Sequence, residues 1–373
     1  MSTLLITPEM LERRTRKGGV YDTMLNNKIG FNSSSLARID YGVHFTKTQG
    51  NKDSDMFVGR DRKEFTTNVF GQISEGFVAH PTGSYNGISE GIFHPITDLQ
   101  RIKMQLDLEC PFDAPPKMKG MFHNLLSTLD NIVDKEANQS RYTRTWLCSS
   151  QDNGDMDRFH INTQPLFKPA SDSQSGNLKT KVKIELDNGD EPPAAIAPTS
   201  SNQTTQLSDT YPCSIWPGYG GPWFNHTNAR AVQLNIRDPQ GRLIRPDETY
   251  LWLAPGAIVL IHATMHIFKY KQTSYFQLNA TSIQIIDKSD INVAPPSVLS
   301  LPSPDKTRFG SASAADSAPI LNFSSMMNTE TASMTVPAAS SSRAPHTRKH
   351  DIDIDNDMFD TPIDVNNLSH RIQ

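Results

Sequence analysis

The sequence predicts a mainly β fold with one long amphipathic helix and a disordered C-terminal tail. Three observations predict it. Apolar and polar residues alternate over 230–244, 255–270 and 274–286; apolar residues recur every three or four positions over 115–137; and Pro, Ser and Ala dominate after residue 290. A period of two is typical of strands with one buried face, and a period near 3.6 is typical of helices.

The three alternating segments predict strands joined by short turns. In 255–270 the residues Val259, Ile261, Ala263, Met265 and Ile267 share one face, and His262, Thr264, His266, Phe268 and Tyr270 share the other. In 274–286 the apolar phase changes after Ala280 to Ile283 and Ile285, which predicts a β-bulge. The segment 230–244 is interrupted by the turn sequence at 238–241.

The rest of the chain divides by composition. A flexible basic arm is predicted for 1–19, where Arg13, Arg14, Arg16 and Lys17 could bind phosphate, direct nuclear import or line a solvated helix end. A β-rich region is predicted for 20–110, the amphipathic helix for 111–140, a β domain with an inserted loop near 187–213 for 141–287, and the disordered tail for 288–373.

Charge and cysteine content narrow the function classes. The net charge of −4 gives no global attraction to nucleic acid, so any such surface must be a local patch. The three cysteines are far apart and suggest neither a disulfide framework nor a zinc site, so no cofactor or metal is expected. No secretory or membrane-spanning pattern is present, and we expect an intracellular protein without membrane association, nuclear if eukaryotic.

Two segments carry residues suited to nucleic acid. A predicted strand places Lys179, Lys181 and Lys183 on its polar face, where they could follow a phosphate backbone or protect an edge strand from aggregation. The aromatic loop 214–226 contains Trp216, Tyr219 and Trp223 among glycines and prolines. These rings could stack on bases or belong to the core.

The end of the tail mixes acids with hydrophobes. Its acidic tip contains Asp353, Asp355, Asp357, Met358 and Phe359. Such a segment could dock onto a basic groove of a partner, compete with nucleic acid for the protein's own binding face, or keep the protein in solution.

The order of features over 178–287 resembles the oligonucleotide-binding (OB) barrel of single-stranded DNA-binding proteins: a lysine-bearing strand, an aromatic loop, a hairpin strand, a P-G-x-I-V strand and Y-F-Q-L. The tail resembles the carboxyl tails of replicative single-strand binders, which recruit other replication proteins. The resemblance implies an OB-like barrel core, although the insertion at 187–213 departs from a compact barrel.

The implied function is non-enzymatic binding of single-stranded DNA or RNA in replication, recombination or repair, with a replication or repair protein docking on the tail. Phosphates would be neutralised by Lys179, Lys181, Lys183, Arg230, Arg237 and Lys269, and bases would stack on Trp216, Tyr219, Trp223 and Tyr270.

Two other classes remain open on the sequence. An enzyme is disfavoured because His262 and His266 fit no recognised metal or nucleophile spacing and no phosphate-binding loop is present. A structural or assembly protein, such as a viral coat-like β-sandwich, is the alternative. Its test is self-association in the absence of nucleic acid.

Overall fold

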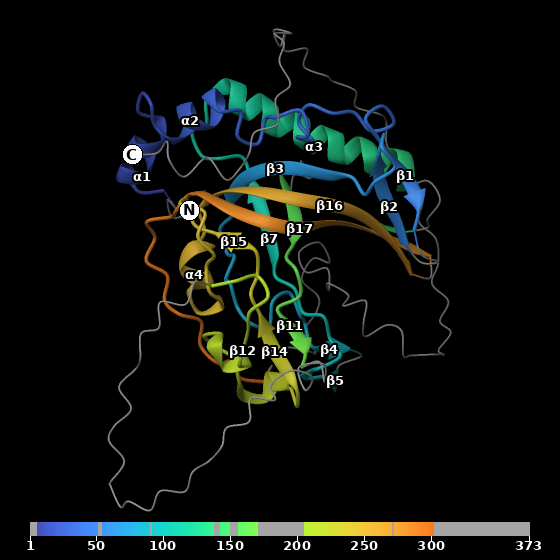
Figure 1. Ribbon diagram of the computed structural model, residues 1–373, viewed down its shortest axis with the longest axis vertical. Coiled ribbons are helices and arrows are strands. Elements are labelled where there is room, and N and C mark those ends of the chain that lie inside the picture. The colour runs from blue at the N-terminus through green and yellow to red at the C-terminus, as the bar shows by residue number, and fades with distance from the viewer. Residues whose placement is uncertain are drawn as a thin grey trace, which may run out of the picture.

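The protein is mostly β-sheet with few helices (Figure 1). The computed structural model describes residues 6–50, 54–89, 92–137, 142–149, 156–170, 205–270 and 272–301. The predicted lysine strand, the inserted loop up to residue 204 and the tail from residue 302, with its acidic tip, lie outside the described residues. No helix of the described part is long and apolar enough to cross a membrane.

Five strands of the main sheet pair in a closed ring. They are β3 (Thr66–Ile73), β7 (Gln105–Glu109), β10 (Arg158–Asn162), β16 (Ile258–Tyr270) and β17 (Thr273–Asp287). The order is β16–β3–β7–β10–β17, and β17 pairs back to β16. The first four follow a Greek key, since the fourth strand in the chain returns beside the first. The ring therefore unites strands from the two regions predicted at 20–110 and 141–287.

Shorter strands extend this sheet. They are β1 (Phe45–Gln49), β2 (Ser54–Gly59), β8 (Tyr142–Arg144), β9 (Leu147–Cys148) and β15 (Ile236–Arg237). Strand β2 pairs with β1 and with the far half of β16, β8 and β15 pair with β17, and β9 pairs with β10. The β16–β17 hairpin thereby becomes the centre of a wide surface.

The two long strands confirm the predicted alternation. Met265 and Leu278 are fully buried in the core, whereas His266 and Gln277 on the opposite face are half-buried. The pairing slips between His262 and Ala263, and this β-bulge accounts for the change of apolar phase in β17.

The amphipathic helix is confirmed as α3 (Pro116–Glu136), shorter than the predicted region 111–140. Its buried stripe includes Phe122, Leu125 and Leu129, at the spacing of one helix face. Phe122 packs against Phe70 of β3 and Phe159 of β10. The helix thus covers one side of the ring (Figure 1).

The flexible arm predicted for 1–19 is wrong for residues 8–15, which form helix α1 (Pro8–Thr15). Helix α2 (Val20–Asn26) follows, at the start of the predicted β-rich region. Arg14 is fully buried, and its Nε donates to Asp287 Oδ2 at 2.6 Å. Its other nitrogens donate to Gln72 Oε1 at 3.1 Å and to the Gly256 carbonyl at 2.6 Å. Each nitrogen of the buried guanidinium has one acceptor, and these contacts tie α1 to β3, to β17 and to the turn before β16.

Short strands form a separate group at the lower end of Figure 1. These are β4 (Ile88–Ser89), β5 (Ile92–Phe93), β6 (Ile96–Thr97), β11 (Phe167–Pro169), β12 (Thr210–Tyr211), β13 (Phe224–Asn225) and β14 (Ala229–Val232), with the short helix α4 (Thr249–Trp252) nearby. The order β11–β14–β12 makes a small sheet. The strand predicted between residue 230 and the turn is not continuous, because buried Gln233 and Leu234 lie between β14 and β15. The turn at 238–241 is confirmed, with Gly241 at a φ of 80°.

The predicted start of the disordered tail at 288 is also wrong for residues 288–301. His80 Nε2 lies 3.1 Å from the Ser297 carbonyl, and Trp223 Nε1 donates to the Ser300 carbonyl at 2.9 Å. Composition did not reveal this path because the contacts use backbone carbonyls, which any residue supplies.

Candidate nucleic-acid interface

The predicted aromatic loop is folded on itself. Trp216 is 2% exposed and belongs to the core, so it presents no face to a base and that prediction is wrong. Tyr219 packs on Phe224 with ring centroids 4.5 Å apart, and its hydroxyl lies 3.2 Å from His226 Nδ1. Burial raises the pKa of Tyr219 to about 12. Trp223 packs edge-on against Phe93, with centroids 5.0 Å apart.

Arg230 lies on a different surface from this aromatic cluster. In the small sheet Phe167 pairs with buried Ala231 and faces Tyr219, whereas Lys168 pairs with Arg230 on the opposite face. Two cations directly opposite each other repel, and an anion bound between them would relieve the repulsion. Arg230 therefore stays a predicted phosphate contact, but it does not share a site with Tyr219.

Arg237 and Lys269 are both engaged within the protein. Arg237 donates to Asn235 Oδ1 at 3.0 Å and to the Gly241 carbonyl at 2.8 Å, which closes the 238–241 turn. Lys269 lies 2.8 Å from an Asp55 carboxylate oxygen. Lys269 and Tyr270 are consecutive on β16, so their side chains point to opposite faces of the sheet.

A second set of aromatic residues is gathered by strand register on the outer face of β8, β17 and β16. Tyr275 of β17 lies opposite Phe268 of β16 and beside Arg144 of β8, whose Cζ is 5.8 Å from the Tyr275 ring centroid. The next row joins Tyr142, Thr273 and Tyr270. We call the residues Tyr142, Arg144, Phe268, Tyr270 and Tyr275 the ribbon face.

These rings lie on the outer face because the alternate residues point inward. Phe276 is buried in the core, whereas Tyr275 is half-buried and Tyr142 is 54% exposed. His266 stacks on Phe268 with centroids 5.8 Å apart, which extends the aromatic row towards the middle of the ring. Rings of this kind on adjacent strands are suited to stacking on unpaired bases.

A chain of polar contacts borders the ribbon face. Lys103, in the connection between β6 and β7, donates to Asn279 Oδ1 at 3.0 Å. The Asn279 amide nitrogen lies 3.2 Å from His266 Nδ1, and His266 Nε2 lies 3.2 Å from Glu64 Oε1. Burial, with Arg101 nearby, lowers the pKa of Lys103. These contacts hold the Lys103 ammonium beside the outer face of β16 and β17.

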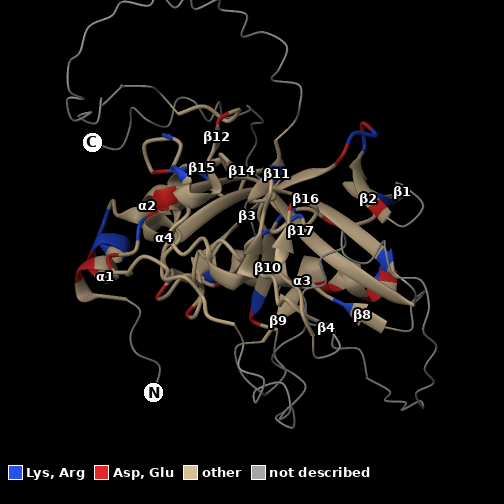
Figure 2. Cartoon of the chain, turned by 90° about the horizontal axis from the view of Figure 1, so that it is seen from below, with Lys and Arg blue, Asp and Glu red and all other residues tan. Residues whose placement is uncertain are grey.

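The turn between β2 and β3 adds exposed positive charge next to Glu64. We call Arg60, Arg62 and Lys63 the basic tip; all three are exposed, and charged residues mark this loop beside β2 in Figure 2. Arg62 has a φ of 62°, where glycine would be less strained. The tip therefore presents arginine at a position that the backbone alone would not favour.

Four histidines near these surfaces give a pH prediction. Burial lowers the pKa of His80, His226, His262 and His266. The unfolded chain then binds more protons than the folded protein below about pH 6.5, so stability falls as the pH falls through that value. We expect the urea midpoint to be lower at pH 5.5 than at pH 7.5.

The comparison that checks this uses single variants. His262→Gln should reduce the loss of stability between pH 7.5 and 5.5, because it removes one of these groups. His123→Gln, at an exposed position of α3, should leave the loss unchanged. Equal pH profiles for wild type and His262→Gln would contradict the assignment of this effect to burial of His262.

Sequence reasoning found Tyr270 but missed Tyr142, Arg144, Phe268 and Tyr275 as a group. The alternation over 255–270 and 274–286 did place Phe268 and Tyr275 on the polar face of their strands. The strands of a tight hairpin pair symmetrically about the turn. The pairing of Tyr270 with Thr273, and hence of Phe268 with Tyr275, could therefore have been predicted. The pairing of β8 with β17 has no sequence signal, since it joins residues 131 positions apart.

Comparison with known proteins found no matching family model and no matching curated protein. A similar solved structure is gp2.5, a single-stranded DNA-binding protein encoded by bacteriophage T7. The identity is 11%, the match covers 61% of this chain and 98% of that chain, and the TM-score is 0.27.

Proposed function

We propose that the protein binds single-stranded nucleic acid across the ribbon face and does so without catalysing a reaction. The observation that carries the proposal is the register of Phe268 opposite Tyr275, with Arg144 beside Tyr275. Aromatic stacking tolerates any base sequence because every base has a π-face. We therefore expect the protein to prefer single strands, of DNA or of RNA, and to show little preference for base sequence.

The ring of strands supports an OB-like barrel as the scaffold. Its five strands follow a Greek-key order and close on themselves, as in an OB-fold. OB-folds bind oligonucleotides with the face of strands 2 and 3 and with the connections between strands 1 and 2 and between strands 4 and 5. Here those connections carry Lys103 and the β16–β17 turn, which lie at the border and the end of the proposed interface.

The outer face of β7 and β10 carries carboxylates and is not suited to binding phosphates. Asp107 and Glu109 lie on it, and Arg158 pairs with Glu109 there at 2.8 Å. Carboxylates repel a phosphate backbone. We therefore place the strand along β16 and β17, towards the basic tip, with Lys168 and Arg230 as a separate phosphate contact.

The test is fluorescence anisotropy with a labelled single strand and a duplex of the same sequence, using the full chain at several salt concentrations. We expect tighter binding of the single strand and a linear fall of log K with log salt, with a slope near −0.7 for each phosphate contacted. Absence of binding at low salt would overturn the proposal. Large oligomers without nucleic acid would then favour the assembly protein.

The basic tip gives a second prediction. The triple variant Arg60→Gln, Arg62→Gln and Lys63→Gln should reduce the magnitude of the salt slope by up to about 2, since each contacted phosphate contributes about 0.7 for single strands. Affinity at low salt should fall for all sequences alike. The measurement is the same titration, repeated over salt.

A matched control removes the same charge elsewhere. Lys17, Lys117 and Lys119 are exposed near α2 and α3, away from the ribbon face. Changing all three to Gln should leave the salt slope almost unaltered. Equal effects of the two triple variants would show that charge acts through the net field and that the tip makes no specific contact.

A further inference from the structure

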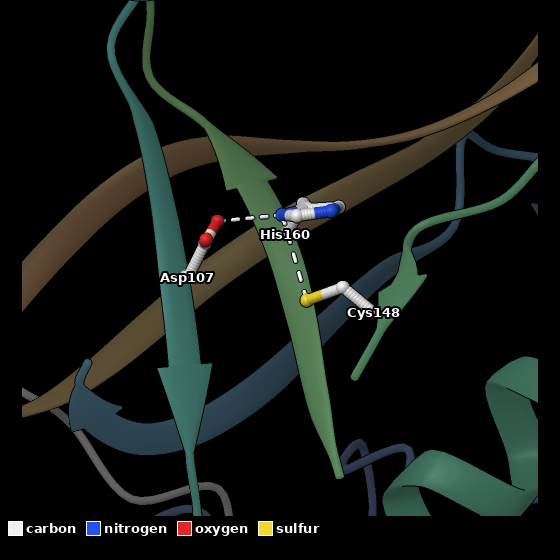
Figure 3. A group of neighbouring side chains, drawn as sticks. All are labelled: Asp107, Cys148 and His160. Carbon is white, nitrogen blue, oxygen red and sulfur yellow. Dashed lines mark hydrogen bonds and ion pairs between the residues drawn. The ribbon is translucent and has the colours of Figure 1, made fainter. Parts of the chain in front are cut away.

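Three potential metal ligands meet on the outer face of β7, β9 and β10 (Figure 3). His160 Nδ1 lies 2.5 Å from Asp107 Oδ1 and 3.8 Å from Cys148 Sγ. One ligand atom from each residue lies within 4.8 Å of the other two. All three side chains are half-buried, so the group has contact with solvent.

Strand register brings these residues together. Asp107 of β7 and His160 of β10 are directly opposite in an antiparallel pair, on the face that alternates with buried Leu106 and Ile161. Cys148 of β9 is opposite Arg158, which places it diagonal to His160 across the strand pair. Diagonal neighbours on one face of a sheet are within reach of each other. The backbone of three paired strands therefore holds the group in place.

The arrangement does not match a nucleophile activated by a histidine base. In such a triad the acid bonds to one ring nitrogen and the nucleophile to the other. Here Asp107 and Cys148 both approach Nδ1 of His160. Convergence of a carboxylate, a thiol and an imidazole on one point is instead what a metal ion requires.

We propose that Asp107, Cys148 and His160 bind Zn²⁺, with a water or an external ligand in the fourth position. A thiolate and an imidazole favour Zn²⁺ over Mg²⁺ or Ca²⁺, which prefer oxygen ligands. The carboxylate and the thiolate together balance the charge of a divalent ion. The sequence predicted no metal because the three ligands have no characteristic spacing along the chain.

The two ligand separations that involve His160 need only small adjustments. Ligands at about 2.0–2.3 Å in a tetrahedral site are separated by roughly 3.3–3.6 Å, close to the present separation of His160 Nδ1 and Cys148 Sγ. The Asp107 oxygen must move away from Nδ1 by less than about 1 Å. The thiol proton is released to solvent, and the imidazole carries its proton on Nε2, so that Nδ1 can donate its electron pair to the metal.

The experiment is titration of the full chain, freed of metal, with Co²⁺ as a spectroscopic substitute for Zn²⁺. We expect a thiolate-to-cobalt charge-transfer band and four-coordinate visible bands that saturate at one equivalent, and displacement by Zn²⁺ but not by excess Mg²⁺. Zn²⁺ should also raise the melting temperature. Failure to saturate at one equivalent would overturn the proposal.

Single variants locate the ion. Cys148→Ser should abolish the charge-transfer band, and Asp107→Asn should weaken Co²⁺ binding by at least about 10-fold while the protein stays folded, since its carboxylate is partly exposed. Cys110→Ser, a half-buried thiol outside the cluster, is the matched control and should leave both bands unchanged. A band that survives in Cys148→Ser would contradict the site. None of these measurements depends on nucleic-acid binding.

Discussion

Replacing Arg14 by alanine is expected to lower the free energy of unfolding by about 3–5 kcal/mol, the usual cost of breaking a buried ion pair. The guanidinium is fully buried and donates to Asp287, Gln72 and the Gly256 carbonyl. Its removal leaves three acceptors without this donor and a cavity beneath α1. Urea unfolding should show a lower midpoint, and the melting temperature should fall by roughly 6–20 °C.

The effect should be specific to the buried arginine. Arg16→Ala, two residues further on and exposed, should change stability by no more than about 0.5 kcal/mol. Arg13→Ala should have a smaller effect than Arg14→Ala, because Arg13 is partly exposed although it also bonds to Asp287. If Arg14→Ala and Arg16→Ala proved equally mild, α1 would not be fixed to the ring as described.

Local patterns predicted the elements whose stability is governed by a buried face. In β16 and in α3, apolar residues recur at the period of a strand and of a helix, so the buried face of each could be predicted. The change of apolar phase in β17 likewise predicted the bulge. The arm at 1–19 failed for a related reason. Its arginines suggested exposure, but Asp287 lies 273 residues away in the sequence, and only the tertiary fold brings it to Arg14.

The candidate site was harder to predict than the fold. Aromatic density along the chain indicated 214–226, yet Trp216 is buried and Tyr219 packs into a cluster. Aromatic residues of the ribbon face are sparse along the sequence, because β8 contributes one ring, β16 two and β17 one. Alternation identifies which residues share a face of one strand, whereas a binding surface depends on which strands are neighbours.

The same limit of local patterns explains why the metal-ligand cluster was not predicted from the sequence. Sequence spacing identifies metal sites built on a single turn or finger, where the ligands are close in the chain. Asp107, Cys148 and His160 belong to three strands, and their approach follows from register alone. The outer face that carries Asp107 is separate from the ribbon face, since Asp107 lies on β7, Phe268 lies on β16, and β3 lies between these strands in the ring.

Removing the two opposed rings is expected to have the largest effect on binding. The double variant Phe268→Ala and Tyr275→Ala should weaken single-strand binding by at least about 2 kcal/mol, or roughly 30-fold, because stacking contributes about 1–3 kcal/mol per base. The rings are neighbours, so their single effects need not add. Neither residue is charged, so the salt slope should stay close to that of the wild type, unlike that of the basic-tip variant.

Three comparisons make this result decisive. Phe112 is an exposed ring near the start of α3, and Phe112→Ala should leave affinity unchanged. This result would show that loss of a surface ring elsewhere does not weaken binding. Trp223→Ala tests the aromatic loop that the sequence predicts as the stacking surface. If Trp223→Ala weakened binding and the double variant did not, the bases would stack on the loop, and the ribbon face would be only a structural part of the sheet. Conversion of both rings to leucine, which maintains apolar contact on the sheet, should weaken binding as alanine does and separates stacking from folding.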